Sequence, residues 1–201
     1  MTTRDPVTTR EWMDLGTALF LGAVDRLRDE DFGTATALPG WTRAHVVAHA
    51  HYNAEALIRL LHWARTGERT PMYAGTGQRN AEIETGAQLP PAELRALVHS
   101  SADALTAAID GLPEEAWSNE VVTAQGRTVP ASEVVWMRTR EVAVHAIDLA
   151  NGVAFSDLPD ELNTALIVDA VMKRSAGGQA AVLAEWLTER STDPPSLGPW
   201  L

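Results

Sequence analysis

A carboxylate and an imidazole lie four residues apart in the segment TREVAVHAID, at Glu141 and His145. Successive residues of an α-helix are rotated by about 100°, so residues four apart lie within about 40° of one another on its surface. Met137 and Leu149 extend the same stripe with apolar side chains, which indicates that the stripe faces the core. Because an unpaired buried carboxylate is costly, Glu141 must be neutral, paired with a cation or bound to a metal ion.

A histidine on an earlier helical segment is also expected to point toward the core. The segment WTRAHVVAHAHYNAEAL contains His45, His49 and His51. His49 shares its helical stripe with Asn53 and Leu57, so it is the best candidate of the three to point inward. His45 falls in the first turn and His51 faces another side of the helix, so both are expected at the surface or facing loops.

Two histidines and one carboxylate, with a fourth position open, form a donor set typical of catalytic zinc sites. Helical bundles commonly build metal sites from side chains on facing helices. If the two segments bring His49, Glu141 and His145 to one point, zinc would compensate the charge of the carboxylate. The competing interpretation is an ordinary contact between residues i and i+4 on one helix. Spacing alone leaves both interpretations open.

Proline and glycine residues divide the chain into helical segments that must position these side chains. Apolar periodicity predicts four long helices, near residues 9–28, 42–64, 90–111 and 130–151. Shorter helices are expected over residues 78–84, after SDLPDEL as far as SAGG, and over residues 179–190. The segment NEVVTAQGRTVP predicts a loop or a two-stranded excursion. Five tryptophans are expected in the core or in pocket walls: Trp12, Trp63, Trp117, Trp136 and Trp186. Together these elements predict an antiparallel bundle with extra C-terminal helices.

The composition argues against several classes of function. The formal net charge is −11, which argues against nucleic acid as a partner without excluding an anionic small molecule. No run approaches the roughly 18 apolar residues of a membrane span. The N-terminal MTTRDPVTTREW lacks the apolar segment of a signal peptide, so a cytoplasmic protein without a membrane partner is expected. The chain has no cysteine and therefore cannot itself supply a thiol nucleophile.

Four segments together closely resemble the mycothiol-dependent maleylpyruvate isomerases, within the DinB-like metalloenzyme superfamily. They are GWTRAHVVAHAHYNAEAL, HWARTGERTPMY, TAQGRTVPASE and WMRTREVAVHAIDL. The match runs in order from about Leu15 to Leu149. The resemblance implies a mainly α fold, a DinB-like four-helix bundle, with a zinc site whose ligands fall on His49, Glu141 and His145.

The resemblance also implies a thiol cofactor, mycothiol, and the cis–trans isomerisation of maleylpyruvate to fumarylpyruvate in gentisate-type aromatic degradation. Zinc can deprotonate a bound thiol. The thiolate would add to the conjugated cis double bond, which becomes single, rotates, and re-forms as trans when the thiol leaves. A chain without cysteine is compatible with such an external nucleophile.

Arginine suits the two carboxylates of maleylpyruvate, because its guanidinium group forms bidentate, charge-assisted hydrogen bonds. Arg79 in GQRNAEIE corresponds to an arginine that the family pattern places near the pocket. Arg127 in AQGRTVP is a second candidate. For each arginine the alternative is a salt bridge that stabilises a loop.

Full-length members of the family carry a small α/β domain after the bundle. Here the segment after Leu149 is short and lacks a clear series of strands. We therefore expect a metal-binding bundle over residues 1–152 and a shortened helical region over residues 153–201. The stretch GGQAAVLAEWLTER resembles the last helix of the family's second domain, and its Arg190 falls where the family has an arginine implicated in the active site.

Three functions fit these expectations. The first is a maleylpyruvate isomerase. The second is a mycothiol S-transferase that joins the thiol to another electrophile, and the third is a DinB-like metal-binding module without catalysis. Zinc content separates the two enzymes from a metal-free module, and recovery of free thiol after turnover separates the isomerase from the transferase. The sequence leaves the oligomeric state open.

Overall fold

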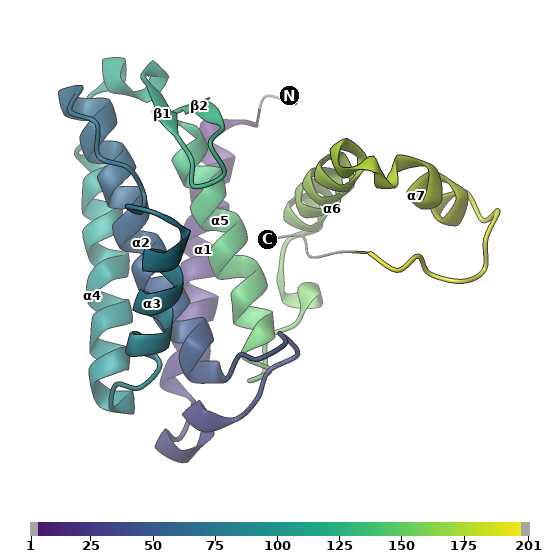
Figure 1. Cartoon of the computed structure of the whole chain (residues 1–201), viewed down its shortest axis with the longest axis horizontal. Coiled ribbons are helices and arrows are strands. Elements are labelled where there is room, and N and C mark those ends of the chain that lie inside the picture. The colour runs from purple at the N-terminus through teal and green to yellow at the C-terminus, as the bar shows by residue number, and fades with distance from the viewer. Residues whose placement is uncertain (1–3, 198–201) are drawn as a thin grey trace. The chain divides into compact units, whose positions relative to one another are not determined.

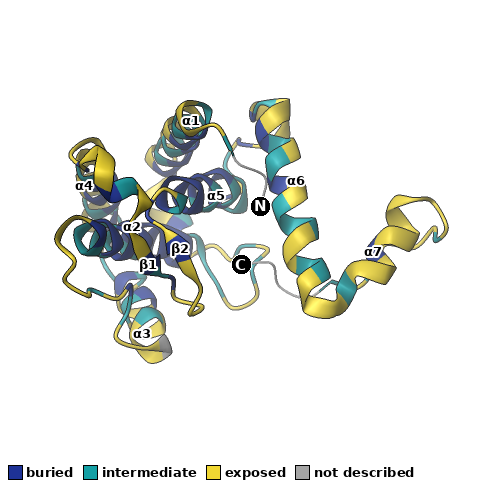
Figure 2. Cartoon of the chain, turned by 90° about the horizontal axis from the view of Figure 1, so that it is seen from above, coloured by how far each residue is buried: buried dark blue, intermediate teal, exposed yellow. Residues whose placement is uncertain are grey.

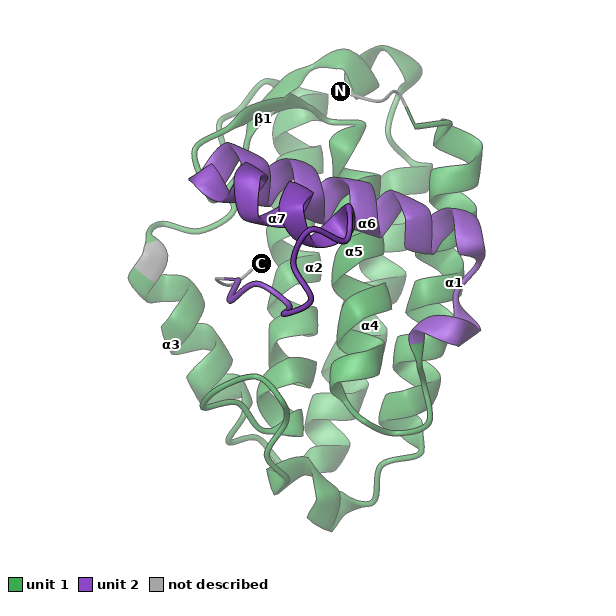
Figure 3. Cartoon of the chain, turned by 90° about the vertical axis from the view of Figure 1, so that its right-hand side faces the viewer, with its two compact units in different colours: residues 1–154 green, residues 155–201 purple. Residues whose placement is uncertain are grey.

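A computed structural model describes residues 4–197 and divides the chain into two compact units, residues 1–154 and residues 155–201 (Figure 3). Residues 1–3 and 198–201, at the ends of the two predicted regions, lie outside the described residues. The α-helices of unit 1 are α1 (Pro6–Asp25), α2 (Arg43–Thr66), α3 (Thr76–Gly86), α4 (Pro91–Asp110) and α5 (Glu133–Asp148). Short 3-10 turns at Asp29–Gly33 and Glu114–Ser118 and a small hairpin connect them.

Helices α1, α2, α4 and α5 form a four-helix bundle (Figure 1). Helix α1 packs along α5, and α2 packs against both α4 and α5. The shorter α3 packs against α2 as a fifth helix beside the bundle. The predicted mainly α, bundle-type fold is confirmed, and the helix bounds lie within a few residues of those predicted.

Local sequence explains where the first two long helices begin and end. Asp5 accepts a hydrogen bond from the backbone N–H of Thr8 at 2.8 Å and so caps α1, whose first turn starts with a proline. Thr42 precedes α2, and the imidazole Nδ1 of His45 accepts a hydrogen bond from the backbone N–H of Thr42 at 3.2 Å. Helix α2 ends at Gly67, whose φ of 76° lies in the left-handed region that glycine adopts without strain.

The segment NEVVTAQGRTVP, predicted to form a loop or a two-stranded excursion, forms two strands. Strands β1 (Glu120–Val122) and β2 (Thr128–Pro130) pair antiparallel, with Val121 opposite Val129. Because β2 includes Pro130, helix α5 begins three residues later than predicted, at Glu133.

A glycine allows α1 to approach α5 closely. A Cβ atom on Gly16 would lie 2.9 Å from Cγ2 of Val142 and 3.3 Å from the backbone nitrogen of Ala143. Both residues belong to the turns of α5 that carry Glu141 and His145. The close contact therefore determines how α1 packs on the side of α5 that faces away from α2.

Buried residues are concentrated on the helices of the bundle (Figure 2), and the apolar ones form two clusters. Helix α2 contributes residues up to position 50 to one cluster and residues from position 54 to the other. Helix α5 contributes residues up to 137 to one and residues from 142 to the other. Buried polar side chains gather near this junction: His49, His51, Asn53, Arg138, Thr139 and His145. The bundle therefore has a polar layer in the middle of its apolar core.

Unit 2 contains α6 (Asp160–Arg174) and α7 (Ala180–Leu187), joined by a π-helical turn at Ser175–Gln179. Its described residues include no strand. Trp186 on α7 is 38% exposed, because α7 buries only Leu183, so of the two expected positions, core or pocket wall, it does not occupy the first. Trp136 in unit 1 is 2% exposed, as predicted. Among the described residues, no helix is long and apolar enough to cross a membrane.

Candidate metal centre and its pocket

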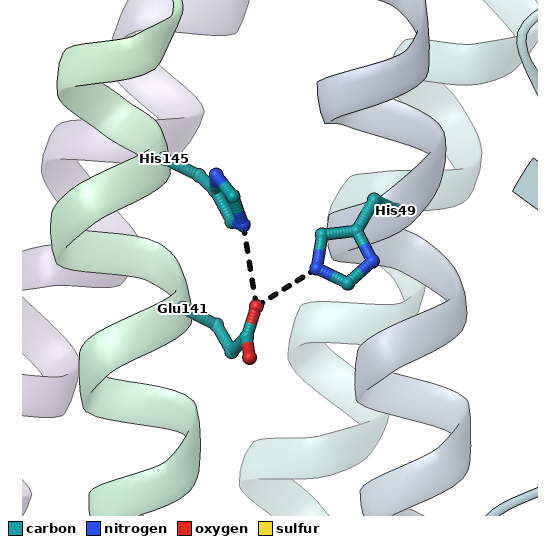
Figure 4. Close-up of side chains that lie close together, drawn as sticks. All are labelled: His49, Glu141 and His145. Atoms are coloured by element: carbon teal, nitrogen blue, oxygen red, sulfur yellow. Dashed lines mark hydrogen bonds and ion pairs between the residues drawn. The ribbon is translucent and has the colours of Figure 1, made fainter. Parts of the chain in front are cut away.

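Three side chains from α2 and α5 meet inside the bundle (Figure 4). The Nε2 atom of His49 lies 2.8 Å from Oε2 of Glu141, and the Nε2 atom of His145 lies 3.3 Å from the same oxygen. One donor atom from each residue lies within 4.8 Å of the others. The structure therefore brings together the three residues that the sequence selected as metal ligands.

The protonation of the two histidines differs because their neighbours differ. Burial lowers the pKa of His49, and this effect outweighs the nearby carboxylate of Glu141. Burial acts in the same direction on His145, but hydrogen bonding to Asp148 and the proximity of Glu141 raise its pKa to about 9. Both histidines hold the pKa of Glu141 well below its usual range despite burial. Without a metal, the site therefore pairs an imidazolium ion with a carboxylate.

The residues present fit a zinc ion. The Nε2 atom of His145 is buried and makes no regular hydrogen bond, although it forms an ion pair with Oε2 of Glu141 at 3.3 Å. A buried donor or acceptor without a regular hydrogen bond is costly. Two imidazole nitrogens and one carboxylate oxygen are the donors that catalytic zinc takes from proteins. Zinc would bind this nitrogen and would replace the proton that His145 otherwise carries.

Asp148 orients one of the candidate ligands. Its Oδ2 atom lies 2.8 Å from Nδ1 of His145, on the side of the ring opposite the Nε2 atom that faces Glu141. Metal-binding histidines usually donate their second ring N–H to such a carboxylate. The sequence prediction missed Asp148, although its spacing of three residues from His145 was a usable signal.

A buried arginine lies one turn before Glu141 on α5. Arg138 is 1% exposed, and its Nη1 atom donates to the backbone oxygen of Ala50 at 2.8 Å and to Oδ1 of Asn53 at 3.1 Å. Burial lowers the pKa of Arg138 to about 10, and Glu141 opposes that shift. Arg138 thus ties α5 to α2 and places a cation near the Glu141 carboxylate. The sequence prediction did not identify this residue.

A pocket of about 230 Å³ is lined by Trp41, Arg79, Asn80, Ile83 and Glu84, of which Trp41 and Arg79 also lie next to His49. The indole ring of Trp41 lies 5.3 Å from the His49 ring and 6.4 Å from the His145 ring, measured between centroids. Trp41 therefore lies beside both rings and also lines the pocket. The sequence prediction did not select Trp41, which directly precedes α2 in the segment GWTRAH.

Of the three predicted arginines, the structure places Arg79 at the pocket. Its Nη2 atom lies 3.4 Å from Nδ1 of His49, and its positive charge contributes to the lowered pKa of that histidine. Arg127 is exposed in the turn between β1 and β2 and does not line this pocket. Arg190 belongs to unit 2, where its guanidinium group donates a hydrogen bond to the backbone oxygen of Thr188.

Neither His45 nor His51 lies at the surface, although His45 faces the loop before α2, which was the other position expected for it. His45 is 9% exposed, because its ring caps α2 beside Thr42 and stacks with Trp41 at 6.4 Å between centroids. His51 is 6% exposed, because α2 also packs against α3 and α4 and has little solvent-facing surface. His51 was expected to face another side of α2 than His49, and its ring indeed packs against the ring of Tyr52.

Comparisons with known proteins agree with this geometry. A family model described as the mycothiol maleylpyruvate isomerase N-terminal domain matches residues 13–150. A crystal structure of the mycothiol-dependent maleylpyruvate isomerase is 44% identical, with a TM-score of 0.82 over 88% of this chain and 75% of that chain. A histidine-to-alanine mutant of a mycothiol-dependent maleylpyruvate isomerase is 43% identical, with the same TM-score and coverage.

A more distant similarity concerns the fold alone. YfiT from Bacillus subtilis, described as a probable metal-dependent hydrolase with an unusual four-helix bundle topology, is 18% identical. It has a TM-score of 0.57 over 75% of this chain and 90% of that chain. No curated protein matches the chain in sequence. From the matched residues and the 44% identity, the chain belongs to the mycothiol-dependent maleylpyruvate isomerase family, as its sequence motifs predicted.

Proposed function

We propose that this protein converts maleylpyruvate to fumarylpyruvate by mycothiol-dependent cis–trans isomerisation, with zinc held by His49, Glu141 and His145. The observation that carries the proposal is the convergence of these three side chains beside an arginine-lined pocket. Membership of the isomerase family supports the choice of reaction. When bound, zinc would hold the thiol sulfur and lower its pKa, and the thiol would supply the nucleophile that adds reversibly to the double bond.

The protein's own residues would prepare the site for that chemistry. Asp148 accepts the hydrogen bond from Nδ1 of His145, which leaves Nε2 directed toward Glu141 and free to bind metal. Arg138 adds a buried positive charge near the Glu141 carboxylate. Trp41 lies beside the two histidines, both of which are buried, and the exclusion of water strengthens electrostatic interactions within the site.

Arg79 is the best placed residue to bind the anionic substrate. Its guanidinium group lies at the pocket beside His49 and can form two parallel hydrogen bonds to a carboxylate. Held in this way, one end of the substrate would stay fixed while the central bond rotates. Arg127 stays a second candidate for substrate binding because arginine suits a carboxylate, and Arg190 stays a candidate for the active site on the strength of the family resemblance.

The experiment that tests the proposal mixes the zinc-loaded protein with mycothiol and maleylpyruvate and follows both isomers and the free thiol by chromatography. We expect fumarylpyruvate to form while the concentration of free mycothiol stays constant. Chelation of the metal should abolish turnover, and added zinc should restore it. Isomerisation without any thiol would overturn the mechanism, and a stable thiol adduct without fumarylpyruvate would show an S-transferase instead.

A further inference from the structure

The pocket at α3 carries opposite charges at two places on one helix. Arg79 and Glu84 both come from α3 and both line the pocket, together with Asn80 and Ile83. Residues four positions apart on a helix, such as Arg79 and Ile83 or Asn80 and Glu84, lie within about 40° of one another. Arg79 lies beside His49, whereas Glu84 lies beside His45, one turn nearer the start of α2. The pocket therefore has a cationic end at the metal centre and an acidic end away from it.

The acidic end is held in place by the start of α2. The Nδ1 atom of His45 accepts a hydrogen bond from the backbone N–H of Thr42, so the proton of the neutral ring is on Nε2. That Nε2 atom lies 3.4 Å from Oε2 of Glu84. The Glu84 side chain is nevertheless 66% exposed, so its carboxylate has acceptor positions left for a ligand.

A pocket that bound only the dianionic substrate would not be expected to carry a carboxylate at this position. Like charges repel one another, and Glu84 would oppose a second carboxylate that entered its end of the pocket. Arg79 supplies the cation that the substrate needs at the other end. The acidic end must therefore contact a different group, one that donates hydrogen bonds.

The side chains at this end match hydroxyl groups. The carboxylate of Glu84 only accepts hydrogen bonds. Asn80 lies between Glu84 and Arg79: its Oδ1 atom accepts a hydrogen bond from Nη1 of Arg79 at 3.4 Å, and its amide N–H groups can donate to a ligand. A hydroxyl group both accepts and donates hydrogen bonds, so neighbouring hydroxyls can be satisfied by this pair. The indole ring of Trp41 offers an apolar wall in the same pocket for the carbon skeleton that carries them.

We propose that Asn80 and Glu84 bind the hydroxyl-bearing body of the thiol cosubstrate, while Arg79 binds the anionic substrate. This inference rests on the proposed function, because it requires a thiol and an anion to share the pocket. Glu84 then acts as a specificity-determining residue. It favours thiols that carry hydroxyl groups over thiols that carry a carboxylate at the same position.

The first test measures KM for each substrate with the zinc-loaded full chain. In Glu84→Gln the amide oxygen can still face His45, but the negative charge is lost. We expect KM for mycothiol to rise about 10-fold while KM for maleylpyruvate changes less than about 2-fold. Arg79→Lys should instead raise KM for maleylpyruvate and leave KM for mycothiol nearly unchanged. The matched control is Glu93→Gln, which removes the same charge from an exposed position on α4 and should change neither KM. A rise of both KM values in Glu84→Gln, or of neither, would overturn the inference.

The second test does not depend on turnover. Titration calorimetry compares the binding of 1-thio-β-glucose, a hydroxyl-bearing thiol, with that of 3-mercaptopropionate, a carboxylate-bearing thiol. We expect the zinc-loaded wild-type protein to prefer the thioglucose and Glu84→Gln to lower that preference about 10-fold. An unchanged preference would contradict the role of Glu84. If no thiol supports isomerisation by the wild-type protein, the proposed function fails, and this ratio still decides the inference about Glu84.

Discussion

The Nδ1 atom of His145 lies 2.8 Å from the Oδ2 atom of Asp148, which follows it by three residues on α5. This hydrogen bond fixes the imidazole ring so that its Nε2 atom faces Glu141 and His49. The orientation of one candidate ligand is thus determined within a single helical turn. Its distance from the third ligand depends on how α5 packs against α2.

Replacing Asp148 by asparagine should weaken zinc binding about 10-fold or more, because the carboxylate that orients His145 and increases its basicity is lost. Competition with a chromophoric chelator measures the affinity. The matched control is Asp103→Asn, which makes the same change at an exposed position on α4 and should leave the affinity unaltered. Equal affinities for Asp148→Asn and the wild-type protein would contradict the orienting role.

Removing both imidazoles of the candidate centre should abolish metal retention. We expect the His49→Ala, His145→Ala double variant, purified without added metal, to contain almost no zinc by elemental analysis, because only one ligand remains. The matched control is the His62→Ala, His99→Ala double variant, since those side chains are 40% and 41% exposed and lie outside the site. Unchanged metal content in the first double variant would refute the ligand assignment.

Zinc affinity should increase with pH because the metal must displace a proton from His145. The pKa of this histidine is raised from 6.5 to about 9, so its protonation stabilises the metal-free fold fully below about pH 6.5, and that contribution is lost as the pH rises through about 9. Because zinc competes with this proton in the folded protein, its affinity should rise by about 10-fold per pH unit below about pH 9 and level off above it. An affinity that is equal at pH 7 and pH 8 would show that His145 is already neutral.

Helix α3 should be sensitive to the size of one residue. A Cβ atom on Gly86 would lie 2.8 Å from Cε2 of Tyr52 and 2.9 Å from Cβ of Ala48, so Gly86→Ala should push the end of α3 away from α2. Because α3 carries Arg79, we expect kcat/KM for maleylpyruvate to fall about 10-fold while zinc content stays unchanged. Gly77→Ala on the same helix meets no atom within 4 Å and should have no effect. A loss of zinc, or equal effects of both substitutions, would contradict this explanation.

The sequence could predict the parts of the site that follow from helical periodicity. Glu141 and His145 share a stripe with Met137 and Leu149, and both apolar residues are buried as that stripe required. His49 was selected by the same rule on α2. Periodicity fixes which face of a helix is apolar, and an apolar face must be buried, so the inward direction of all three candidate ligands was available without coordinates.

The local sequence was less informative where another element covers a helix. His51 lies on a face of α2 that diverges from His49, and the expectation of exposure followed from treating that face as open to solvent. The packing of α3 and α4 against α2 buries it. In the same way Trp186 has the residue type of a core position but lies on a helix with little to pack against in its own unit.

What the sequence by itself determined is the set of helices, the inward stripes on two of them and, through its motifs, the family. Only the tertiary structure decided which side chains from different elements meet. It placed Trp41 beside the histidines, Arg138 near Glu141, and Arg79 and Glu84 in one pocket. The physical reason is that rotation along one helix depends on residue number alone, whereas contacts between helices depend on their packing, down to single positions such as Gly16 and Gly86.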